Sequence, residues 1–380
     1  MFTRQIALPR DKSFFLLGPR GTGKSTLLRR LFPGALYIDL LDITVYTELL
    51  THPERLEARA LALPTAPDRI VIDEIQRIPA LLDEVHRLIE RRRWRFALTG
   101  SSARKLRRGG VNLLAGRARN ATMHPLTAAE LGDAFDLTHS VRFGQLPSAY
   151  VEKDPKAYLA SYVGTYLREE VQAEALTRNL DVFSRFLVAA TFSQASVLSV
   201  ATVARDLGLA RKTVEGYFDL LDDLLLAVRL PVFTRRAKRP MTAHPKFFFF
   251  DAGVYRALRP RGPLDSAEEI DGPAVETLVL QELRATNDNL GLGYELFYWH
   301  TRDHKEVDFV LYGERGLLAL EVKRSVRFRD ADLAPLQMFK RDYPVARCFF
   351  LYGGRDEYET DGIRVLPLAR ALPGLGRLLK

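Results

Sequence analysis

A glycine-rich segment near the amino end has the residue types and spacing that suit phosphate binding. Residues 18–26 read GPRGTGKST, in which glycines precede an adjacent lysine and serine. In such a loop, backbone N–H groups turn toward phosphate oxygens, and the N-terminus of the following helix favours their negative charge. The lysine reaches the β- and γ-phosphates and the serine hydroxyl binds Mg²⁺. We therefore expect ATP and Mg²⁺ here, bound by Gly18, Pro19, Arg20, Gly21, Thr22, Gly23, Lys24, Ser25 and Thr26.

The elements around this segment are those that a phosphate-binding loop requires. Residues 14–17 read FFLL, a short apolar run that predicts a buried parallel strand. Residues 25–31 follow as the first turns of a helix. The order strand, glycine loop, helix supports the motif, because a chance match would not have both neighbours in place.

A second strand ends in two acids. Residues 70–72 are Ile, Val and Ile, and Asp73 and Glu74 follow them directly. In phosphoryl transfer one acid holds the metal through its waters and another orients the attacking water. We expect Asp73 in the first role and Glu74 in the second, where it also deprotonates that water.

Two further positions are candidates for contacting the γ-phosphate. A third apolar strand, residues 94–99, ends beside Ser101, which we expect to sense the phosphate, with Thr99 as the alternative. Arg117 is expected to act as an arginine finger supplied by a neighbouring subunit, since a cation stabilises charge on the equatorial oxygens. Arg119 competes for that role, and an ordinary surface arginine is a further alternative.

These segments together resemble a known family. They read GPRGTGKST at 18–26, IVIDEIQRIP at 70–79, LTGSSARKL at 98–106, LLAGR at 113–117 and PLTAAEL at 125–131. They are similar to bacterial AAA+-type ATPases with a C-terminal domain of uncertain function, often called "ATPase AAA" proteins, over nearly the whole chain. The resemblance implies ATP hydrolysis, a homo-oligomer in the form of a ring, a winged helix-turn-helix, and a C-terminal fold similar to PD-(D/E)xK nucleases.

Composition limits the classes of protein to be considered. The chain has 380 residues and is 47% hydrophobic, which predicts two to three domains with packed cores. Its single cysteine, Cys348, lies in an apolar strand and leaves no intrachain disulfide, which favours a reducing compartment. No run reaches the roughly 18 apolar residues of a membrane span. The start of the chain also lacks room for a cleavable signal, so a cytoplasmic protein without membrane partners is expected.

Positive charge is concentrated in one segment. Residues 86–119 contain eleven Arg or Lys and one Glu, a net +10, which leaves about −1 for the rest of a chain of net charge +9. A smaller basic cluster lies at residues 235–239. Concentrated basic charge favours nucleic acid, and we expect DNA as the partner. The alternative is that these arginines line subunit interfaces and face bound nucleotide.

The middle of the chain reads as helical. Helices are expected over residues 155–178 and 180–191, and a helix-turn-helix over residues 200–208 and 211–221, with a wing strand at 227–233.

The second helix of that pair has mixed signals for DNA binding. Its first turns carry Arg211, Lys212, Thr213 and Tyr217, whereas its later turns are acidic. An acidic surface suits a phosphate-lined groove poorly. The alternative is therefore a winged helix that serves only to pack domains together.

Two neighbouring hydrophobic strands near the C-terminus carry a possible metal site. Asp308 lies on the first, and Glu321 and Lys323 lie two residues apart on the second, so these two share a face. The carboxylates could share Mg²⁺ or Mn²⁺, with Lys323 activating water or stabilising the transition state. Glu276, on a helix over residues 273–283, is a third candidate ligand, and Gln337 could contribute. The resemblance points to the same residues, and a degenerate nuclease fold that binds without cutting is the alternative.

The sequence therefore predicts an α/β protein with three domains. Residues 1–140 are expected to form an AAA+ P-loop ATPase domain, residues 141–238 a helical and winged-helix region, and residues 239–380 a restriction-endonuclease-like α/β domain. The expected function is a DNA-acting ATPase with a metal-dependent nuclease-like domain. The alternative is a nucleotide-driven switch or remodelling ATPase whose C-terminal domain does not cleave.

Overall fold

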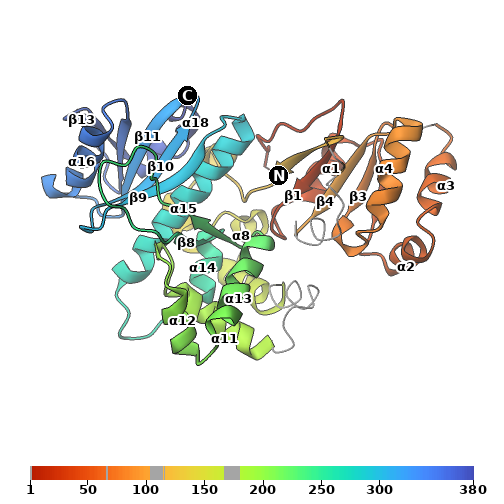
Figure 1. Cartoon of the computed structure of the whole chain (residues 1–380). Helices are drawn as coiled ribbons and strands as arrows, with labels where there is room; N and C mark the ends of the chain where they lie inside the picture. The colour runs from red at the N-terminus through yellow and green to blue at the C-terminus, as the bar shows by residue number, and fades with distance from the viewer. Residues whose placement is uncertain (1, 66, 103–113, 115, 167–179) are drawn as a thin grey trace. The chain divides into compact units, whose positions relative to one another are not determined.

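A computed structural model describes residues 2–65, 67–102, 114, 116–166 and 180–380 of the chain. The chain divides into two compact units. The first holds residues 6–124 with 223–225, and the second holds residues 1–5, 125–222 and 226–380 (Figure 1). Among the described residues, no helix is both long and apolar enough to cross a membrane.

The first unit is built on a five-stranded parallel sheet. Its strands are β1 (Ser13–Leu17), β2 (Leu36–Asp39), β3 (Ile70–Asp73), β4 (Phe96–Gly100) and β5 (Ala118–Thr122). Their order is β2-β3-β4-β1-β5, and every pair is parallel. Strand β4 lies between β1 and β3. Because these three strands are parallel, their carboxyl ends lie at the same edge of the sheet. The glycine loop follows β1, Glu74 follows β3 and Ser101 follows β4.

Helices cover both faces of this sheet, as parallel sheets require. They are α1 (Lys24–Leu31), α2 (Ile43–Thr51), α3 (Arg55–Leu61) and α4 (Leu81–Arg92), with a 3₁₀ turn, η1, at Ile75–Arg77. Successive side chains of β1 point to opposite faces of the sheet. Phe15 and Leu17 pack in the core beneath α2, α3 and α4. Phe14 and Leu16 pack instead with Leu28 of α1. The apolar run that the sequence shows before the glycine loop is therefore a strand buried on both faces.

The second unit begins with short helices. They are α6 (Ala128–Leu131), η2 (Gly132–Ala134), α7 (Leu137–Phe143), α8 (Pro147–Val151), α9 (Pro155–Ser161), a π-helical turn η3 (Tyr162–Tyr166) and α11 (Leu180–Thr191). In the helix expected over residues 155–178, α9 ends at Ser161 and the π-helical turn begins at Tyr162. Residues 167–179 lie outside the described part of the chain.

The predicted pair of helices follows. They are α12 (Val200–Leu207) and α13 (Arg211–Asp223), and Gly208 between them has a left-handed φ of 65°. Strands β6 (Ser196–Val197), β7 (Ala227–Leu230) and β8 (Lys246–Phe249) form an antiparallel sheet in the order β6-β8-β7. The expected wing strand ends earlier than predicted, at Leu230, where Pro231 follows.

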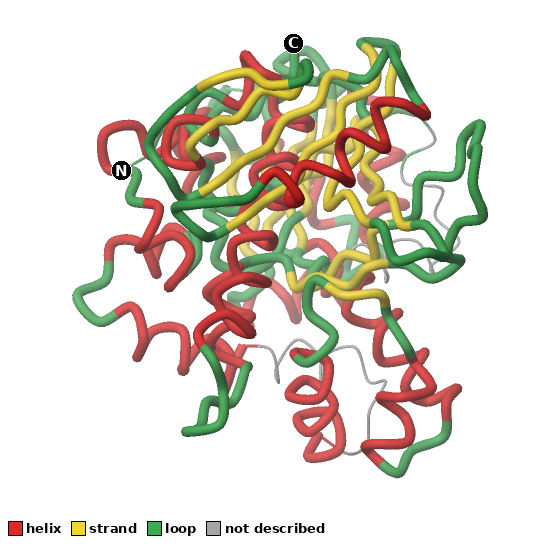
Figure 2. The backbone as a smooth tube through the Cα atoms, turned by 90° about the vertical axis from the view of Figure 1, so that its left-hand side faces the viewer, coloured by secondary structure: helices red, strands yellow, loops and turns green. Residues whose placement is uncertain are grey.

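A six-stranded mixed sheet forms the core of the C-terminal region (Figure 2). Its strands are β9 (Glu295–His300), β10 (Glu306–Gly313), β11 (Gly316–Lys323), β12 (Arg347–Tyr352), β13 (Tyr358–Thr360) and β14 (Ile363–Pro367), in the order β13-β14-β12-β11-β10-β9. The helices here are α14 (Ala252–Leu258), α15 (Ala267–Leu290), η4 (Asp330–Leu333), α16 (Ala334–Asp342), α17 (Leu368–Ala371) and α18 (Leu375–Leu378). Leu336 and Phe339 of α16 pack with Val310, Ala319 and Phe350 of the sheet.

Cys348 is a core residue, as the sequence predicts. It lies in β12 and is 2% exposed. Burial raises the pKa of its thiol to about 11, so it stays protonated at neutral pH.

The compact units differ from the three domains expected from the sequence. The first boundary lies after His124 instead of residue 140, and the middle and C-terminal regions form one unit. Polar contacts across long sequence distances explain the difference. Gln281 Nε2 donates to the Leu126 carbonyl at 2.9 Å, and Ala128 N donates to Glu282 Oε1 at 2.6 Å. The segment after β5 is thereby fixed to α15.

The carboxyl group of Glu282 should make folding pH-dependent. Burial raises its pKa to about 8, well above the ordinary value of 4.5. A raised folded-state pKa stabilises the fold fully below the unfolded pKa, and this contribution is lost as the pH rises through 8. Wild type should therefore lose roughly 2 kcal/mol relative to Glu282→Gln between pH 6 and pH 8, in urea unfolding at each pH. Glu268→Gln, at an exposed position of the same helix, is the control. Parallel pH profiles of wild type and Glu282→Gln would contradict the assignment.

Candidate functional site

The glycine loop joins β1 to α1 and is closed around a buried lysine. Gly21 and Gly23 have φ values of 82° and 89°, a region that strains residues with a Cβ. Lys24 is 5% exposed, and its Nζ donates to the carbonyls of Gly18 at 2.7 Å and Pro19 at 3.2 Å. The loop carbonyls therefore hold a cation at the N-terminus of α1, where a phosphate would be bound.

Thr99 joins the two acids at the end of β3. Its hydroxyl donates to Asp73 Oδ1 and accepts a hydrogen bond from Glu74 N at 3.1 Å. Asp73 is 4% exposed, and Glu74 has a left-handed φ of 60°, an uncommon backbone conformation for this residue type. Thr99, the alternative sensor, thus contacts the carboxylate of Asp73 and the backbone of Glu74.

The Glu74 carboxylate is held by an amide. Gln76 Nε2 donates to Glu74 Oε2 and to Ser101 Oγ at 3.0 Å, and Ser101 Oγ lies 3.4 Å from Glu74 Oε2. Ser101, the predicted sensor, is therefore beside the predicted base. Gln76 is not among the residues expected from the sequence, although its place two residues after Glu74 could have suggested a role. The amide of Gln76 thereby orients the Glu74 carboxylate through its Oε2 atom.

Tyr37 of β2 links Ser25 to Asp73. Its hydroxyl donates to the Ser25 carbonyl at 3.3 Å, and burial followed by the negative charge of Asp73 raises its pKa. Ser25 is half-buried and Thr26 is exposed. A lysine, a serine hydroxyl and a buried carboxylate around one loop fit a nucleoside triphosphate with Mg²⁺, which would supply charge neutralisation at the phosphates.

The two arginine-finger candidates lie at the surface of the unit. Arg117 pairs with Glu90 of α4, and their side chains are 38% and 47% exposed. Arg119 is exposed on β5, a strand at the edge of the sheet. Neither is paired with the acids of the site among the described residues, so a role for either would need a second subunit.

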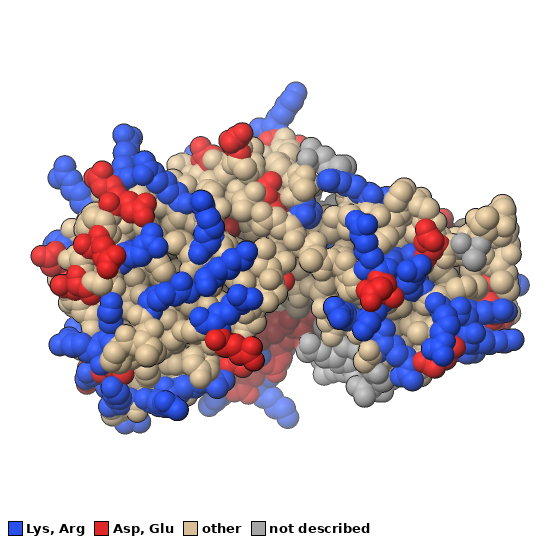
Figure 3. All heavy atoms as spheres, turned by 90° about the horizontal axis from the view of Figure 1, so that it is seen from above, with Lys and Arg blue, Asp and Glu red and all other residues tan. Residues whose placement is uncertain are grey.

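Part of the basic segment is neutralised within the first unit. Arg87 pairs with Glu57 at 2.5 Å and with Glu84 at 2.6 Å, and Arg92 pairs with Glu57 at 2.7 Å. The cluster at residues 104–108 lies outside the described residues. Figure 3 shows acidic side chains interspersed among many cationic ones on the face in view. For the described residues of the segment, the count of Arg and Lys therefore overstates the unpaired positive charge.

A buried lysine lies among the carboxylates predicted to bind metal. Lys246 Nζ of β8 lies 2.8 Å from Glu276 Oε2, 2.5 Å from Glu306 Oε1 and 3.3 Å from Asp308 Oδ1. Its side chain is 2% exposed. Lys246 and Glu306 are not among the residues expected from the sequence, where the only signal is a lysine that opens a run of four phenylalanines.

The remaining predicted residues surround this ion cluster. Asp308 and Glu321 adjoin the paired residues Phe309 and Leu320 of β10 and β11, and Asp308 Oδ2 accepts from Val322 N at 2.8 Å. Lys323 Nζ lies 3.7 Å from Glu321 Oε1. Gln337 instead donates to Asp361 at 2.9 Å.

The carboxyl groups of this cluster have raised pKa values in the structure. Burial, then the charge of Asp308, raises the pKa of Glu276 to about 8 and also raises the pKa of Glu321. Among the described residues, no group of three acidic, histidine or cysteine side chains is placed to hold a metal. These contacts therefore give the predicted Mg²⁺ or Mn²⁺ site no support, because the ammonium of Lys246 lies among the carboxylates that were expected to bind the metal.

The second helix of the helix-turn-helix has its side chains engaged. The ring of Tyr217 lies 5.2 Å from that of Phe183 in α11. Arg229 of β7 pairs with Asp219 at 2.7 Å and with Asp222. Tyr217 and the acidic turns therefore serve packing, which favours the alternative that this pair of helices holds the unit together.

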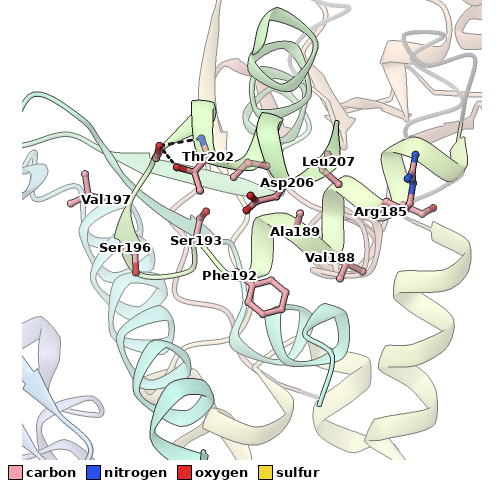
Figure 4. Close-up of a pocket in the computed structure, with 13 residues that line it drawn as sticks. Arg185, Val188, Ala189, Phe192, Ser193, Ser196, Val197, Thr202, Asp206 and Leu207 are labelled. Carbon is pink, nitrogen blue, oxygen red and sulfur yellow. Dashed lines mark hydrogen bonds between the residues drawn. The ribbon is translucent and has the colours of Figure 1, made fainter. Parts of the chain in front are cut away.

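A cavity of about 800 Å³ lies between α11 and α12. Val188 and Ala189 of α11 lie on one side, and Thr202 and Asp206 of α12 lie on the other (Figure 4). Apolar groups and hydroxyls make up most of its lining. It adds none of the predicted site residues.

Comparisons with known proteins identify the domains of the chain. Residues 10–132 match the model of an AAA domain, and residues 135–265 and 271–371 match models of two different domains of unknown function. Uncharacterized proteins of Mycobacterium tuberculosis and Mycobacterium bovis are each 29% identical over 84% of this chain and 72% of their own. An uncharacterized protein of Haemophilus influenzae is 21% identical over 80% of this chain and 78% of its own.

Solved structures give weaker likenesses. The ORC1 protein of Aeropyrum pernix in complex with DNA is 14% identical with a TM-score of 0.32, over 66% of this chain and 87% of its own. A protein of Vibrio cholerae is 12% identical with a TM-score of 0.24, over 97% of both chains. The chain thus carries an AAA-family ATPase domain, followed by regions whose matching families have no known function.

Proposed function

We propose that this protein hydrolyses ATP in its N-terminal unit. Lys24 contacts the β- and γ-phosphates, Ser25 and Asp73 hold Mg²⁺, and Glu74 is the base. The observation that carries this proposal is the meeting of the glycine loop and the Asp73–Glu74 pair at the carboxyl ends of strands in one parallel sheet. The match of residues 10–132 to an AAA domain supports it.

The reaction needs one proton acceptor. The oxygen of a water molecule bonds to the γ-phosphorus while the bond from that phosphorus to the ADP oxygen breaks. Glu74 takes the proton of the water, while the amide of Gln76 holds its Oε2 atom in place. Thr99 holds the backbone N of Glu74 and the carboxylate of Asp73 in place during this step.

Arg117 is proposed as the cation supplied by a second subunit of a homo-oligomer. Its exposure and its pairing with a surface glutamate leave it accessible to a neighbour. Mixing Arg117→Ala subunits with Lys24→Ala subunits should restore part of the ATP hydrolysis that each lacks alone, because some interfaces then combine an intact loop with an intact arginine. Arg119→Ala tests the competing residue in the same mixture. If co-assembled mixtures remain inactive, Arg117 is not the finger.

For the C-terminal region the ion cluster favours a domain that does not cleave. The proposed partner is DNA, supported by the excess positive charge, and the proposed compartment is the cytoplasm.

The test compares wild type, Glu74→Gln and Asp308→Ala on linear, circular and single-stranded DNA with Mg²⁺ or Mn²⁺. We expect no cleavage, DNA-stimulated ATP hydrolysis in wild type, and its loss in Glu74→Gln. Cleavage that disappears only in Asp308→Ala would establish a nuclease instead. Hydrolysis that ignores DNA would point to a protein partner.

A further inference from the structure

A second cavity in the C-terminal unit is lined by cations. It has a volume of about 470 Å³ and lies between α7, α9 and α14. Its charged lining residues are Arg142, Lys156, Arg256, Arg259 and Arg261. Among the described residues, no aspartate or glutamate lines it. The cavity therefore offers an anion many donors and no competing acid on its walls.

Two of the cations form ion pairs with acids that do not line the cavity. Arg256 pairs with Asp271, and Arg259 Nη2 lies 3.0 Å from Asp265 Oδ1. The side chains of these two arginines are only 10% and 8% exposed. They are fixed in place and serve as the rigid part of the lining.

The other three cations form no ion pair with an acid in the described part of the chain. No acid among the described residues forms an ion pair with Arg142, Lys156 or Arg261, and all three are exposed. Arg142 stacks on the ring of Phe143, at 5.2 Å. Burial, then repulsion from Arg256, lowers the pKa of Arg261. An anion in the cavity would relieve this repulsion and gain charge-assisted hydrogen bonds.

The cavity also has apolar walls and a packed base. Phe143, Leu159, Ala160 and Ala257 supply the apolar surface. A Cβ at Gly253 would meet the Phe143 carbonyl oxygen at 2.1 Å, so α14 packs directly on the end of α7. Secondary-structure packing therefore shapes the cavity, and its volume falls in the range of small-ligand sites.

We propose that this cavity binds a phosphomonoester group, with Arg142, Lys156 and Arg261 as its donors. A phosphate dianion matches the planar fork of a guanidinium, and three cations without an ion pair to a described acid exceed its charge. The apolar walls accept the sugar and base attached to it. The volume suits one nucleotide, whether free or at the 5′ end of a nucleic-acid strand. This site lies in the other unit from the ATPase site, and the proposal is independent of ATP hydrolysis.

The test uses the full chain with Lys24→Ala, so that the glycine loop does not contribute. Calorimetric titrations employ AMP and a short single-stranded oligonucleotide with either a 5′-phosphate or a 5′-hydroxyl end. In this background the pair Arg142→Gln and Arg261→Gln should weaken binding at least about tenfold. The pair Lys153→Gln and Arg302→Gln, exposed in the same unit but outside the cavity, should leave it unchanged.

Each outcome decides the proposal. Binding of AMP identifies a free nucleotide as the ligand, and a preference for the 5′-phosphorylated strand over the 5′-hydroxyl strand identifies a strand end. The proposal is wrong if none of the probes binds, if the two oligonucleotides bind equally and AMP does not bind, or if the cavity pair binds as tightly as the control pair. Thermal unfolding of each variant confirms that these surface changes leave the fold intact.

Discussion

Replacing Glu74 with Gln should lower kcat for ATP hydrolysis by about 10²- to 10⁴-fold, the usual contribution of a positioned general base. The side chain keeps its size, so ATP binding should change little. The amide cannot take the proton of the attacking water, and that loss acts on the chemical step alone. Single-turnover hydrolysis and equilibrium ATP binding separate the two effects.

The control is Glu54→Gln, an exposed glutamate of the same unit, which should hydrolyse ATP like wild type. A fall in ATP affinity that matches the fall in rate would instead mean that Glu74 contributes to binding. Unchanged hydrolysis in Glu74→Gln would remove it as the base and leave Asp73 to be tested next.

Replacing Lys246 with Met should destabilise the protein by about 3–5 kcal/mol, the usual cost of removing one partner of a buried ionic cluster. Glu276, Glu306 and Asp308 would then lie close together without a counter-charge. Urea unfolding of the full chain measures the loss. Lys305→Met, at an exposed position, should have little effect.

Mn²⁺ provides a second measurement on the same variant. If the ammonium occupies the place of a divalent ion, millimolar Mn²⁺ should raise the melting temperature of Lys246→Met without nucleotide and leave wild type unchanged. Stabilisation of wild type by Mn²⁺ that Asp308→Ala abolishes would show that a metal site exists after all.

The arrangement of the proposed ATPase site was the easier part to predict because its signals are local. Strand, glycine loop and helix follow one another over residues 14–31, and Asp73 and Glu74 directly follow an apolar strand. The glycine loop and the two acids are then expected to lie close together, because the carboxyl ends of parallel strands lie at the same edge of a sheet. The amide of Gln76 depends on the left-handed turn at Glu74, which the residue types do not indicate.

The C-terminal site shows the limit of the same reasoning. Periodicity placed Glu321 and Lys323 on one face of a strand, and the structure brings Asp308 beside them. The periodicity of the sequence could not identify Lys246, because this residue is 30 residues from Glu276 and 62 from Asp308 along the chain. The boundary between the two compact units, after residue 124, also depends on contacts between residues far apart in the sequence. Ala128, for example, donates a hydrogen bond to Glu282, which is 154 residues away.

The most direct test of the central claim is equilibrium binding of ATP with Mg²⁺ to the purified full chain and to its Lys24→Ala variant. We predict saturable binding to wild type, competed by ADP and lost or greatly weakened in the variant. Absence of binding by wild type to both adenine and guanine triphosphates would contradict the account. Equal binding by the variant would show that the glycine loop is not the site.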